Sequence, residues 1–375
     1  MKIVIDARSV DIRQSGVGNH VTQLIRGLKT IDGRNQYGLM VTRGQLKNAP
    51  TFFDQFEVYQ APFSNENHIF GDPWEFFLLP KELRKRGVNL FHGPAFMAPP
   101  FHKGFKSVST IHDLVAFHHP HTIPTKYAYY MRFLIHLMIR RADAIITVSE
   151  FIRHEIIQQF KVDEGRIFAV PNSVSDHFRP VDDNERINAL KLKYGIKKRY
   201  FLHVGNIEPR KNLVNLFRAC DRIWDKLHND FQLVVVGKRG WLYSEIFDTL
   251  KKAEFSSNVV FTGYVSDDDM PVLYSGADFF IFPSVYEGFG LPILEAMRCG
   301  VPVITSRVAS LPEVAGEAAL YVNPHNPDDI AEKMMTLAYD DTLKEALREK
   351  GFHQARNFSW EKTARKTLDV YEMVG

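Results

Sequence analysis

Short apolar runs alternate with helical patterns along the whole chain, and this alternation most restricts the possible fold. The runs carry few polar residues, which is typical of strands that are buried on both faces of a parallel sheet. The sequence therefore predicts an α/β fold with two doubly wound sheets. The expected strands are 2–7, 37–42, 56–61, 89–93, 106–111, 144–149, 166–170, 200–205, 231–237, 259–264, 279–283, 302–306 and 319–323.

Helical periodicity fills the intervals between these runs. Ligands of such sheets bind outside the carboxyl ends of the strands. Two such domains facing each other would form an interdomain cleft, which is the usual place for a small-molecule site. The expected helices are at about 18–31, 126–141, 150–160, 211–227, 241–254, 288–299, 327–338, 341–356 and 359–373.

The length of 375 residues exceeds the usual size of a single hydrophobic core. Loop-favouring residues concentrate in 171–194, which we take as the linker region. We therefore expect a first Rossmann-like domain over 1–175 and a second over 176–358.

Composition excludes several classes of protein. The net charge of +3 is small, and no basic run resembles a nucleic-acid-binding arm. The two cysteines, Cys220 and Cys299, form neither a disulfide framework nor a metal-ligand cluster. The first residues are typical of a strand rather than a signal peptide, and no apolar segment reaches the roughly 20 residues that span a bilayer. We expect a cytoplasmic protein that does not bind nucleic acid.

The segment 282–297 places two carboxylates around the start of a helix. Pro292 suits a first helical turn, and Gly300 suits its end. The free N–H groups of a helix start attract phosphate, whereas Glu287 before it and Glu295 inside it suit neutral hydroxyl groups. Phosphate flanked by hydroxyl groups describes a nucleotide sugar. The alternative is a solvated loop residue at 287 and an ordinary early-helix acid at 295.

Two adjacent cations, Arg210 and Lys211, follow another strand and open the next predicted helix. Arginine can bind a diphosphate with two hydrogen bonds, and lysine adds a compact charge. A solvated basic helix start is the alternative, but cations oppose the helix dipole there. These residues therefore indicate a phosphate clamp.

Several segments in order resemble the retaining GT-B glycosyltransferases of the family called GT4. The resemblance covers nearly the whole chain, and it implies a last helix, 359–375, that crosses back to the first domain. The segments are Gly16-Val-Gly18-Asn-His, Thr110-Ile-His112-Asp113-Leu, Thr147-Val-Ser149-Glu-Phe, Val170-Pro-Asn172-Ser-Val, Gly205-Asn-Ile-Glu-Pro-Arg210-Lys211-Asn212 and Glu287-x7-Glu295.

The resemblance also implies roles for individual residues. The first domain would bind the acceptor, and the second would bind the nucleotide sugar. His112 would contact the transferred sugar, and Asp113 would orient it or bind the acceptor. Arg210 and Lys211 would neutralise the leaving diphosphate in place of a metal. The resemblance places Glu287 on the donor sugar and Glu295 on the ribose, so the expected catalytic residues are His112, Arg210, Lys211 and Glu287. The other expected donor-binding residues are Gly16, Gly18, Gly205, Gly237, Val265, Gly288, Phe289, Gly290, Leu291 and Glu295.

Neither a metal nor a cofactor is expected. The spacing of Asp267 and Asp269 could suggest Mg²⁺, but Ser266 with Asp269 fits a capping box before a short helix. The loop from Gly16 to Gly18 lacks the third glycine of a dinucleotide fingerprint, because Val21 stands there. A Rossmann dehydrogenase is therefore disfavoured.

Within the family, three segments look most like those of bacterial mannosyltransferases of polysaccharide assembly: Gly16-Val-Gly-Asn, Thr110-Ile-His-Asp-Leu and Gly237-Lys-Arg-Gly-Trp241. They favour a metal-independent, retaining transfer of mannose from GDP-mannose to a glycan or lipid-linked acceptor. A glucosyltransferase that uses UDP-glucose is the main alternative. A sugar-nucleotide epimerase, a phosphorylase of similar fold and a non-catalytic binding subunit also remain open.

The acceptor region is less clear from the sequence. Core packing is the simpler explanation of its many apolar residues, but an acceptor groove or a peripheral contact with the inner membrane surface would use the same ones. The segment 81–86 could touch anionic lipid or form a solvated helix face. The apolar residues are Phe52, Phe53, Phe56, Phe63, Phe70, Trp74, Phe76, Phe77 and the segment 131–141.

Overall fold

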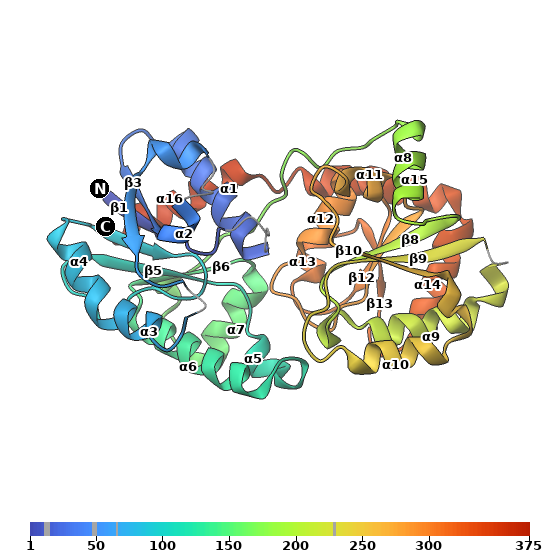
Figure 1. Cartoon of the computed structure of the whole chain (residues 1–375), viewed down its shortest axis with the longest axis horizontal. Coiled ribbons are helices and arrows are strands. Elements are labelled where there is room, and N and C mark those ends of the chain that lie inside the picture. Colours follow the sequence, from blue (N-terminus) through green and yellow to red (C-terminus); the bar gives the residue numbers. More distant parts are fainter. Residues whose placement is uncertain (11–15, 47–50, 65–66, 228–229) are drawn as a thin grey trace. The chain divides into compact units, whose positions relative to one another are not determined.

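The computed structural model describes residues 1–10, 16–46, 51–64, 67–227 and 230–375. The chain divides into two compact units, each assembled from separate segments (Figure 1). The first unit comprises Met1–Leu114, Tyr129–Asn172 and Ser359–Gly375, and the second comprises Val115–Ala128 and Ser173–Phe358.

The first unit is built on a parallel sheet that has seven strands among the described residues. Its spatial order is β3-β2-β1-β4-β5-β6-β7, so the direction of winding reverses between β1 and β4. All the predicted strands of this half are confirmed to within two residues at either end. They are β1 (Lys2–Asp6), β2 (Gln36–Thr42), β3 (Glu57–Ala61), β4 (Leu90–Gly93), β5 (Lys106–Ile111), β6 (Ala144–Thr147) and β7 (Ile167–Ala169).

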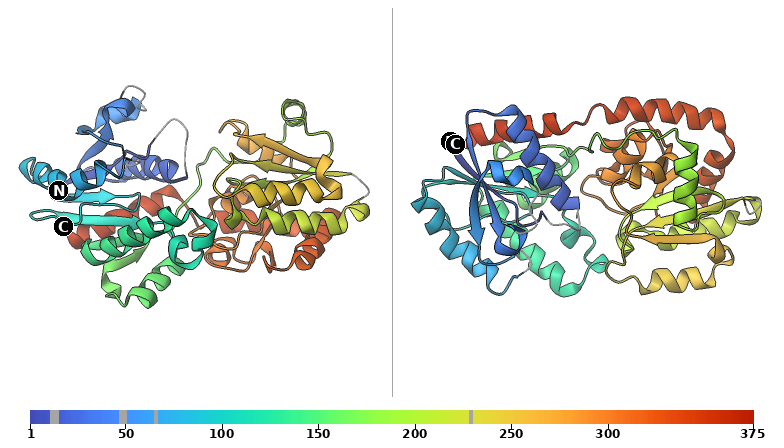
Figure 2. Two further views of the ribbon diagram at one scale, coloured as in Figure 1. Left: turned by 60° about the horizontal axis from the view of Figure 1, so that its bottom comes forward. Right: turned by 45° about the horizontal axis from the view of Figure 1, so that its top comes forward.

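Helices cover both faces of this sheet (Figure 2). The segment of α3, η2 and α4, in which η2 is a π-helix, was not predicted, because its aromatic residues follow no single helical face. The longer helices are α1 (Gly16–Ile31), α6 (Thr125–Arg141), α7 (Glu150–Phe160) and α16 (Trp360–Val374). The short pieces are α2 (Arg43–Leu46), η1 (Thr51–Gln55), α3 (Gly71–Pro73), η2 (Trp74–Leu78), α4 (Leu79–Lys85) and η4 (Glu164–Arg166).

Helix α16 packs on α1 in the first unit, as the resemblance implied. Gly27 allows the close approach, since a Cβ atom there would lie 2.9 Å from the Cβ atom of Ala364. Leu368 and Tyr371 of α16 lie in the same hydrophobic core as Leu24 of α1.

The second unit contains a parallel sheet with six strands among the described residues, in the order β10-β9-β8-β11-β12-β13. The winding reverses here between β8 and β11. The predicted strands are again confirmed. They are β8 (Arg199–Val204), β9 (Phe231–Val236), β10 (Val259–Gly263), β11 (Phe279–Phe282), β12 (Val303–Ser306) and β13 (Ala319–Val322).

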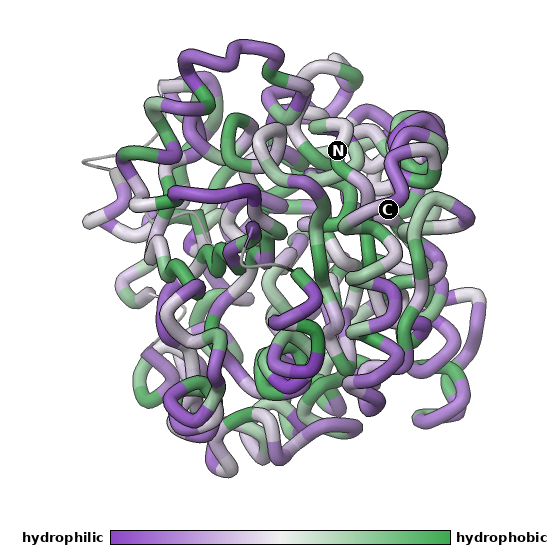
Figure 3. Tube along the Cα trace, turned by 90° about the vertical axis from the view of Figure 1, so that its right-hand side faces the viewer, coloured by the Kyte–Doolittle hydropathy of each residue, from purple (hydrophilic) through white to green (hydrophobic). Residues whose placement is uncertain are grey.

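The helices of the second unit include all those that periodicity predicted. Figure 3 shows hydrophobic stretches in the interior and hydrophilic ones on many outer turns. The helices are α8 (Asn184–Lys193), α9 (Leu213–Ile223), α10 (Ser244–Lys252), α11 (Met270–Ser275), α12 (Leu291–Arg298), α13 (Leu311–Ala315), α14 (Pro327–Tyr339) and α15 (Asp341–Ala355). The short pieces are α5 (Val115–His118), η3 (Pro120–Thr122), η5 (Pro209–Lys211), η6 (Asp225–Leu227) and η7 (Glu254–Asn258).

The segment Val115–Ala128 belongs to the second unit, although the sequence suggested a first domain that runs unbroken to 175. The aromatic contacts of this segment explain why it groups with the second unit. The rings of His118 and His119 lie 5.9 Å and 5.2 Å from the ring of Tyr286, and the ring of Tyr127 lies 4.7 Å from that of Trp241. These contacts join residues far apart in sequence, so local pattern gives no sign of them.

The expectation that the aromatic residues of 52–77 pack in the core is correct for some and wrong for others. Phe53 and Trp74 are buried, whereas Phe70 and Phe77 are exposed. Within the part of the chain that the structure describes, no helix combines the length and hydropathy needed to cross a membrane.

Candidate active site

The loop after β8 carries Arg210 and Lys211 on the short helix η5. The expectation that these residues open the next long helix is wrong, because α9 begins only at Leu213. Asn212 stands between the two elements with a φ of 61°, a left-handed conformation that asparagine tolerates. Its side chain donates hydrogen bonds to the carbonyl oxygens of Pro283 (3.0 Å) and Pro324 (2.7 Å).

The first bond fastens the loop after β8 to the loop after β11, and the second fastens it to the loop after β13. The backbone N–H of Val285 also donates to the carbonyl oxygen of Arg210, at 3.0 Å. Since β8 and β11 are the strands between which the winding reverses, the two loops lie at the switch point of the sheet. Doubly wound sheets bind their ligands at this place.

Four charged side chains meet there and form what we call the ionic cluster: Glu208, Arg210, Lys211 and Glu287. Glu287 lies at its centre and is only 6% exposed. One of its carboxylate oxygens accepts from Arg210 Nη1 and the other from Lys211 Nζ, each at 2.6 Å. Arg210 Nη2 donates to Glu208 at 2.9 Å. The structure therefore brings together three of the four expected catalytic residues.

Burial and pairing set the protonation of the ionic cluster. Burial lowers the pKa of Lys211, against the attraction of Glu287. Burial disfavours the charged form of Glu287, but Arg210 and Lys211 outweigh it and hold the pKa of Glu287 below its ordinary value. Lys211 Nζ also lies 4.8 Å from the centroid of the Phe282 ring, which favours a cation. Glu287 is thus ionised at neutral pH, and the alternative of a solvated loop residue is wrong.

The start of α12 lies directly beyond Glu287. Gly290 has a φ of 120°, and a Cβ atom there would lie 3.0 Å from Leu311, so this position requires glycine. Ser310 Oγ fastens the loop through contacts of 2.8 Å with the carbonyl oxygens of Glu287 and Phe289. In the first turn of α12, Pro292 has no N–H and the N–H of Ile293 donates to the carbonyl oxygen of Gly290 at 3.0 Å, so an anion at this helix start would bind the backbone before Pro292.

The predicted positions of Pro292 and Gly300 at the ends of this helix are confirmed, although the helix begins at Leu291 rather than at 288. Pro292 stands in the first turn. At the other end the N–H of Gly300 bonds to Met297 and that of Val301 to Ala296, which is a Schellman motif. The expected ligand residues Gly288 and Leu291 flank the loop, and the Phe289 ring packs on that of Phe358 at 5.7 Å.

Two glycines allow the ends of β8 and β9 to approach closely. A Cβ atom on Gly237 would lie 2.1 Å from the carbonyl oxygen of Gly205, and one on Gly205 would lie 3.2 Å from Lys211 Cε. A larger residue at position 205 would press on Lys211, and one at position 237 would displace the backbone of Gly205. The expected donor-binding residue Val265 is buried.

Glu295 lies on α12 and accepts a hydrogen bond of 2.7 Å from the hydroxyl group of Tyr274 on α11. Burial raises the pKa of Glu295 to about 7, although Tyr274 pulls it down. An ordinary solvated helix acid would not show this shift. The sequence does not indicate a role for Tyr274, because no motif links position 274 to position 295.

We expect Glu295→Gln to flatten the dependence of stability on pH. Glu295 has a pKa of 4.5 when unperturbed and about 7 in the folded chain, so between these values the folded state holds a proton that the unfolded chain has released. The free energy of unfolding then falls as pH rises through this window. Glutamine does not ionise, so the variant should gain stability relative to the wild type from pH 5 to pH 8 (about the limits of the window).

The measurement is the Tm of both proteins across this range. Glu349→Gln, on the exposed side of α15, is the matched control and should follow the wild type. Equal slopes for all three proteins would contradict the assignment of a raised pKa to Glu295.

In the first unit, His112 follows β5. Its Nε2 atom lies 2.7 Å from the carbonyl oxygen of Pro94, which can only accept, so Nε2 carries the proton. Burial lowers the pKa of His112 and keeps the ring neutral. Its Nδ1 atom is therefore a hydrogen-bond acceptor, suited to a hydroxyl group. Asp113 is half-buried beside it.

His20 on α1 packs edge-on against His112, with ring centroids 5.1 Å apart. Its Nδ1 atom lies 2.7 Å from Asn172 Oδ1, and burial lowers its pKa well below the usual range. His20 and Asn172 both stand in the segments that carried the family resemblance, but neither was assigned a role. The expected donor residues Gly16 and Gly18 lie in the first turn of the same helix.

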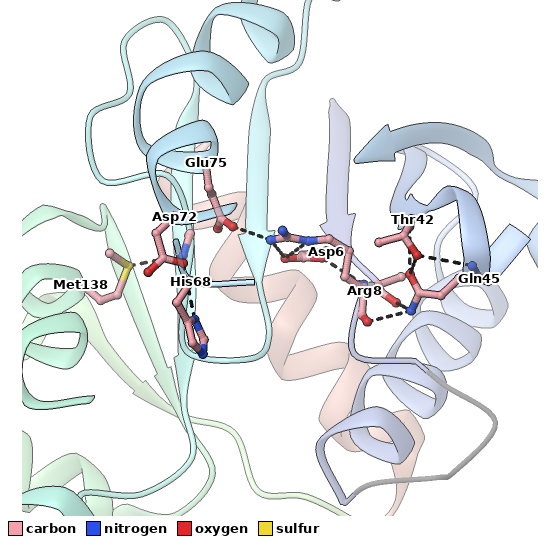
Figure 4. Close-up of polar contacts among 10 residues, drawn as sticks. Asp6, Arg8, Thr42, Gln45, His68, Asp72, Glu75 and Met138 are labelled. Atoms are coloured by element: carbon pink, nitrogen blue, oxygen red, sulfur yellow. Dashed lines mark hydrogen bonds and ion pairs between the residues drawn. The ribbon is translucent and has the colours of Figure 1, made fainter. Parts of the chain in front are cut away.

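A second charged group lies at the end of β1, beside the switch point of the first sheet (Figure 4). Arg8 is 4% exposed and contacts two carboxylates, Asp6 on β1 and Glu75 on the π-helix η2. Gln45 Nε2 donates to the carbonyl oxygens of Arg8 and Val10, each at 2.7 Å. The residues from Arg8 to Val10 are therefore held from two sides.

Two family models match this chain. One, described as "Glycosyl transferases group 1", covers residues 187–354, and the other, "Glycosyltransferase Family 4", covers 14–178. The O-antigen chain mannosyltransferase B of Escherichia coli is 36% identical over 78% of this chain and 76% of its own length. The chain belongs to the family 4 glycosyltransferases.

Other similarities agree with this family. The serotype-specific mannosyltransferase WbdA of Escherichia coli is 32% identical over 71% of the chain, which spans 33% of WbdA. The structure of Anabaena Alr3699/HepE in complex with UDP and glucose superposes with a TM-score of 0.74 at 19% identity, covering 99% of both chains. At that identity the similarity shows the fold, and it confirms the predicted GT-B architecture.

In this glycosyltransferase, the predicted capping box at Ser266 is wrong. Helix α11 begins at Met270, and Asp269 makes no cap with its side chain. Its carboxylate accepts from Lys193 (2.6 Å) and Tyr194 (3.0 Å), and it also bonds to Ser266. Among the residues that the structure describes, no group of His, Cys, Asp and Glu side chains could hold a metal ion.

Proposed function

We propose that this glycosyltransferase transfers mannose from GDP-mannose to a glycan or lipid-linked acceptor, with retention of configuration and without a metal ion. The observation that carries the proposal is the ionic cluster, in which Arg210 and Lys211 are held on Glu287 at the switch point of the sheet. The mannose assignment rests on the similarity to the mannosyltransferases of Escherichia coli.

The ionic cluster suits a diphosphate leaving group. Its four charges sum to zero, because Glu208 and Glu287 balance Arg210 and Lys211. A bound diphosphate would draw both cations toward itself and stabilise the negative charge that develops as the glycosidic bond breaks. The backbone N–H of Leu291, at the start of α12, would add to this stabilisation. No divalent ion is required in this arrangement.

Glu287 would take a second role once the phosphate is bound. Drawing Arg210 and Lys211 toward the diphosphate would free its carboxylate oxygens for hydroxyl groups of the donor sugar. Because these hydroxyl groups would then occupy its carboxylate oxygens, we do not assign Glu287 a covalent step. The leaving phosphate would accept the proton of the attacking acceptor hydroxyl on the same face of the sugar.

The remaining expected residues keep binding roles in this proposal. His112 Nδ1 would accept from a hydroxyl group of the transferred sugar, and Asp113 would orient it or bind the acceptor. Glu295 would accept from the ribose. Backbone groups of the glycine loops would approach the phosphate and the base, at Gly16, Gly18, Gly205, Gly237, Val265, Gly288, Phe289, Gly290 and Leu291.

The test is calorimetric binding of GDP, UDP, ADP and their sugars to the purified protein, with EDTA present. We expect selective binding of GDP and GDP-mannose, and mannosyl transfer that survives EDTA. A preference for UDP species would move the donor to UDP-glucose. Loss of transfer in EDTA that Mg²⁺ or Mn²⁺ restores would contradict the metal-independent mechanism. Release of an altered donor sugar without any acceptor would favour an epimerase.

A further inference from the structure

Phe96, in the loop after β4, has a backbone conformation that phenylalanine rarely adopts. Its φ is 70°, in the left-handed region where a Cβ atom crowds the following carbonyl oxygen. Among the residues that the structure describes, this is the largest positive φ outside glycine. A glycine would take up this conformation without strain. A bulky residue that is kept in it points to a function of the side chain.

The backbone of Phe96 is held by β5, the strand that leads to His112. The N–H of Phe96 donates to the carbonyl oxygen of Thr110 at 3.0 Å. The carbonyl oxygen of Phe96 accepts from Ser109 Oγ at 2.5 Å. The strand that positions the histidine therefore also positions the strained residue.

The chain on either side of Phe96 is tightly packed. A Cβ atom on Gly93 would lie 1.7 Å from the carbonyl oxygen of Met97, so the loop folds back on itself at a distance that only glycine allows. The N–H of Ala98 lies 3.3 Å from Sδ of Met138 on α6, and Ala98 is fully buried. The loop therefore holds the Phe96 ring in one place.

That place is beside the imidazole of His112. The two rings pack edge to face, with centroids 5.4 Å apart and planes at 61°. His20 gives the imidazole a second ring contact, with centroids 5.1 Å apart. The hydrogen bond from His112 Nε2 to the carbonyl oxygen of Pro94 fixes the tautomer. A single hydrogen bond would let the ring pivot about it, whereas the ring contacts restrict that rotation.

Burial does not explain why phenylalanine occupies position 96. Its side chain is half-buried, whereas Phe91 on β4 is fully buried in the core of the same unit. A half-buried ring gains less from the hydrophobic effect than a core residue does, and here it must also offset a strained backbone. The contact with His112 gives the ring a use that burial does not.

We propose that Phe96 is a positioning residue for His112: its ring holds the imidazole at the angle from which Nδ1 accepts from a hydroxyl group of the transferred sugar. This inference rests on the proposed function, because the sugar contact of His112 is part of that proposal. Phe96 itself touches neither the reacting atoms nor the diphosphate in this assignment, and it acts only through the histidine.

The test compares Phe96→Gly and Phe96→Ala with the wild type. Both variants remove the ring, but only glycine relieves the left-handed backbone. We expect both to lower kcat by about 10–100-fold, the usual effect of a misplaced functional group, with a much smaller change in the KM for the donor. The Tm of Phe96→Gly should exceed that of Phe96→Ala by about 2–4 °C.

NMR spectra of protein that carries isotope-labelled histidine report on the imidazole directly. In the wild type, His112 should show a protonated Nε2 and an unprotonated Nδ1. In both Phe96 variants, the two nitrogen signals should move toward the average of the two tautomers. His112→Gln identifies these signals among the 15 histidines of the chain. The spectra need neither donor nor acceptor, so they test the hold on the ring apart from the reaction.

Two matched controls separate the ring contact from general effects. Lys161→Gly relieves a φ of 51° at the exposed end of α7, so it should raise Tm without changing kcat. Phe101→Ala removes an exposed ring from the same loop as Phe96 and should leave kcat unchanged. Neither control should shift the signals of His112.

Two results would overturn the proposal: His112 signals that stay the same in both Phe96 variants, or wild-type kcat in a variant whose signals have moved. A failure of the transferase assignment would look different. The wild type would then bind no nucleotide and transfer no sugar, while the spectral change would still show that Phe96 positions the imidazole.

Discussion

Lys211→Ala is expected to lower kcat by about 10²–10³-fold, because Lys211 supplies charge to the leaving diphosphate. The fold should survive, since Arg210 still pairs with Glu287 and Glu208. The measurement is steady-state transfer with saturating donor, alongside thermal unfolding. A loss in kcat that exceeds any rise in the KM for the donor would place Lys211 in the transition state.

Lys211→Arg and Lys226→Ala serve as controls for this variant. The first keeps the charge but must fit a guanidinium beside Gly205 and Phe282, so we expect partial activity. The second removes an exposed lysine of η6 and should have no effect. Normal turnover by folded Lys211→Ala would remove this residue from the mechanism.

Glu287→Ala is expected to abolish transfer and to destabilise the second unit by about 3–5 kcal/mol, the usual result of removing one partner from a buried ion pair. Lys211 would be left buried without its carboxylate, whereas Arg210 would keep Glu208. The measurement is unfolding by denaturant, followed by tryptophan fluorescence.

Glu287→Gln removes the negative charge but keeps the size of the side chain. The amide oxygen still accepts one hydrogen bond, so the stability of this variant should lie between those of the wild type and the alanine variant. Glu208→Gln removes a carboxylate at the edge of the ionic cluster and should cost less than Glu287→Gln. If Glu287→Ala were as stable as the wild type, the ionic cluster would not be a structural unit.

The fold could be predicted almost completely from the sequence, because buried parallel strands are read from local composition. The run Phe279–Phe282 is apolar at every position and is a central strand. The helical segment around η2 was not predicted, because its buried residues do not recur at a regular helical spacing. In η2, Trp74 faces the interior and Phe77 faces solvent, and only the tertiary partner of Glu75 explains which side is which.

The candidate site could be predicted residue by residue but not as a set of contacts. Arg210 and Lys211 belong to one motif and Glu287 to another, and the sequence suggests separate partners for them on phosphate and sugar. The structure pairs them with one another, because β8 and β11 are neighbours in the sheet although their residues are far apart in the chain. Likewise, the sequence suggests Glu295 as a binding residue but does not predict its hydrogen bond with Tyr274.

Helix α16 has a consequence for the order in which the chain folds during synthesis. Leu368 and Tyr371 complete the core of the first unit, and Tyr371 lies 2.6 Å from His92 on β4. A ribosome makes this helix only after the whole second unit. Until then the apolar side of α1 lacks its cover, so the nascent first half must persist as an incomplete intermediate that chaperones can recognise.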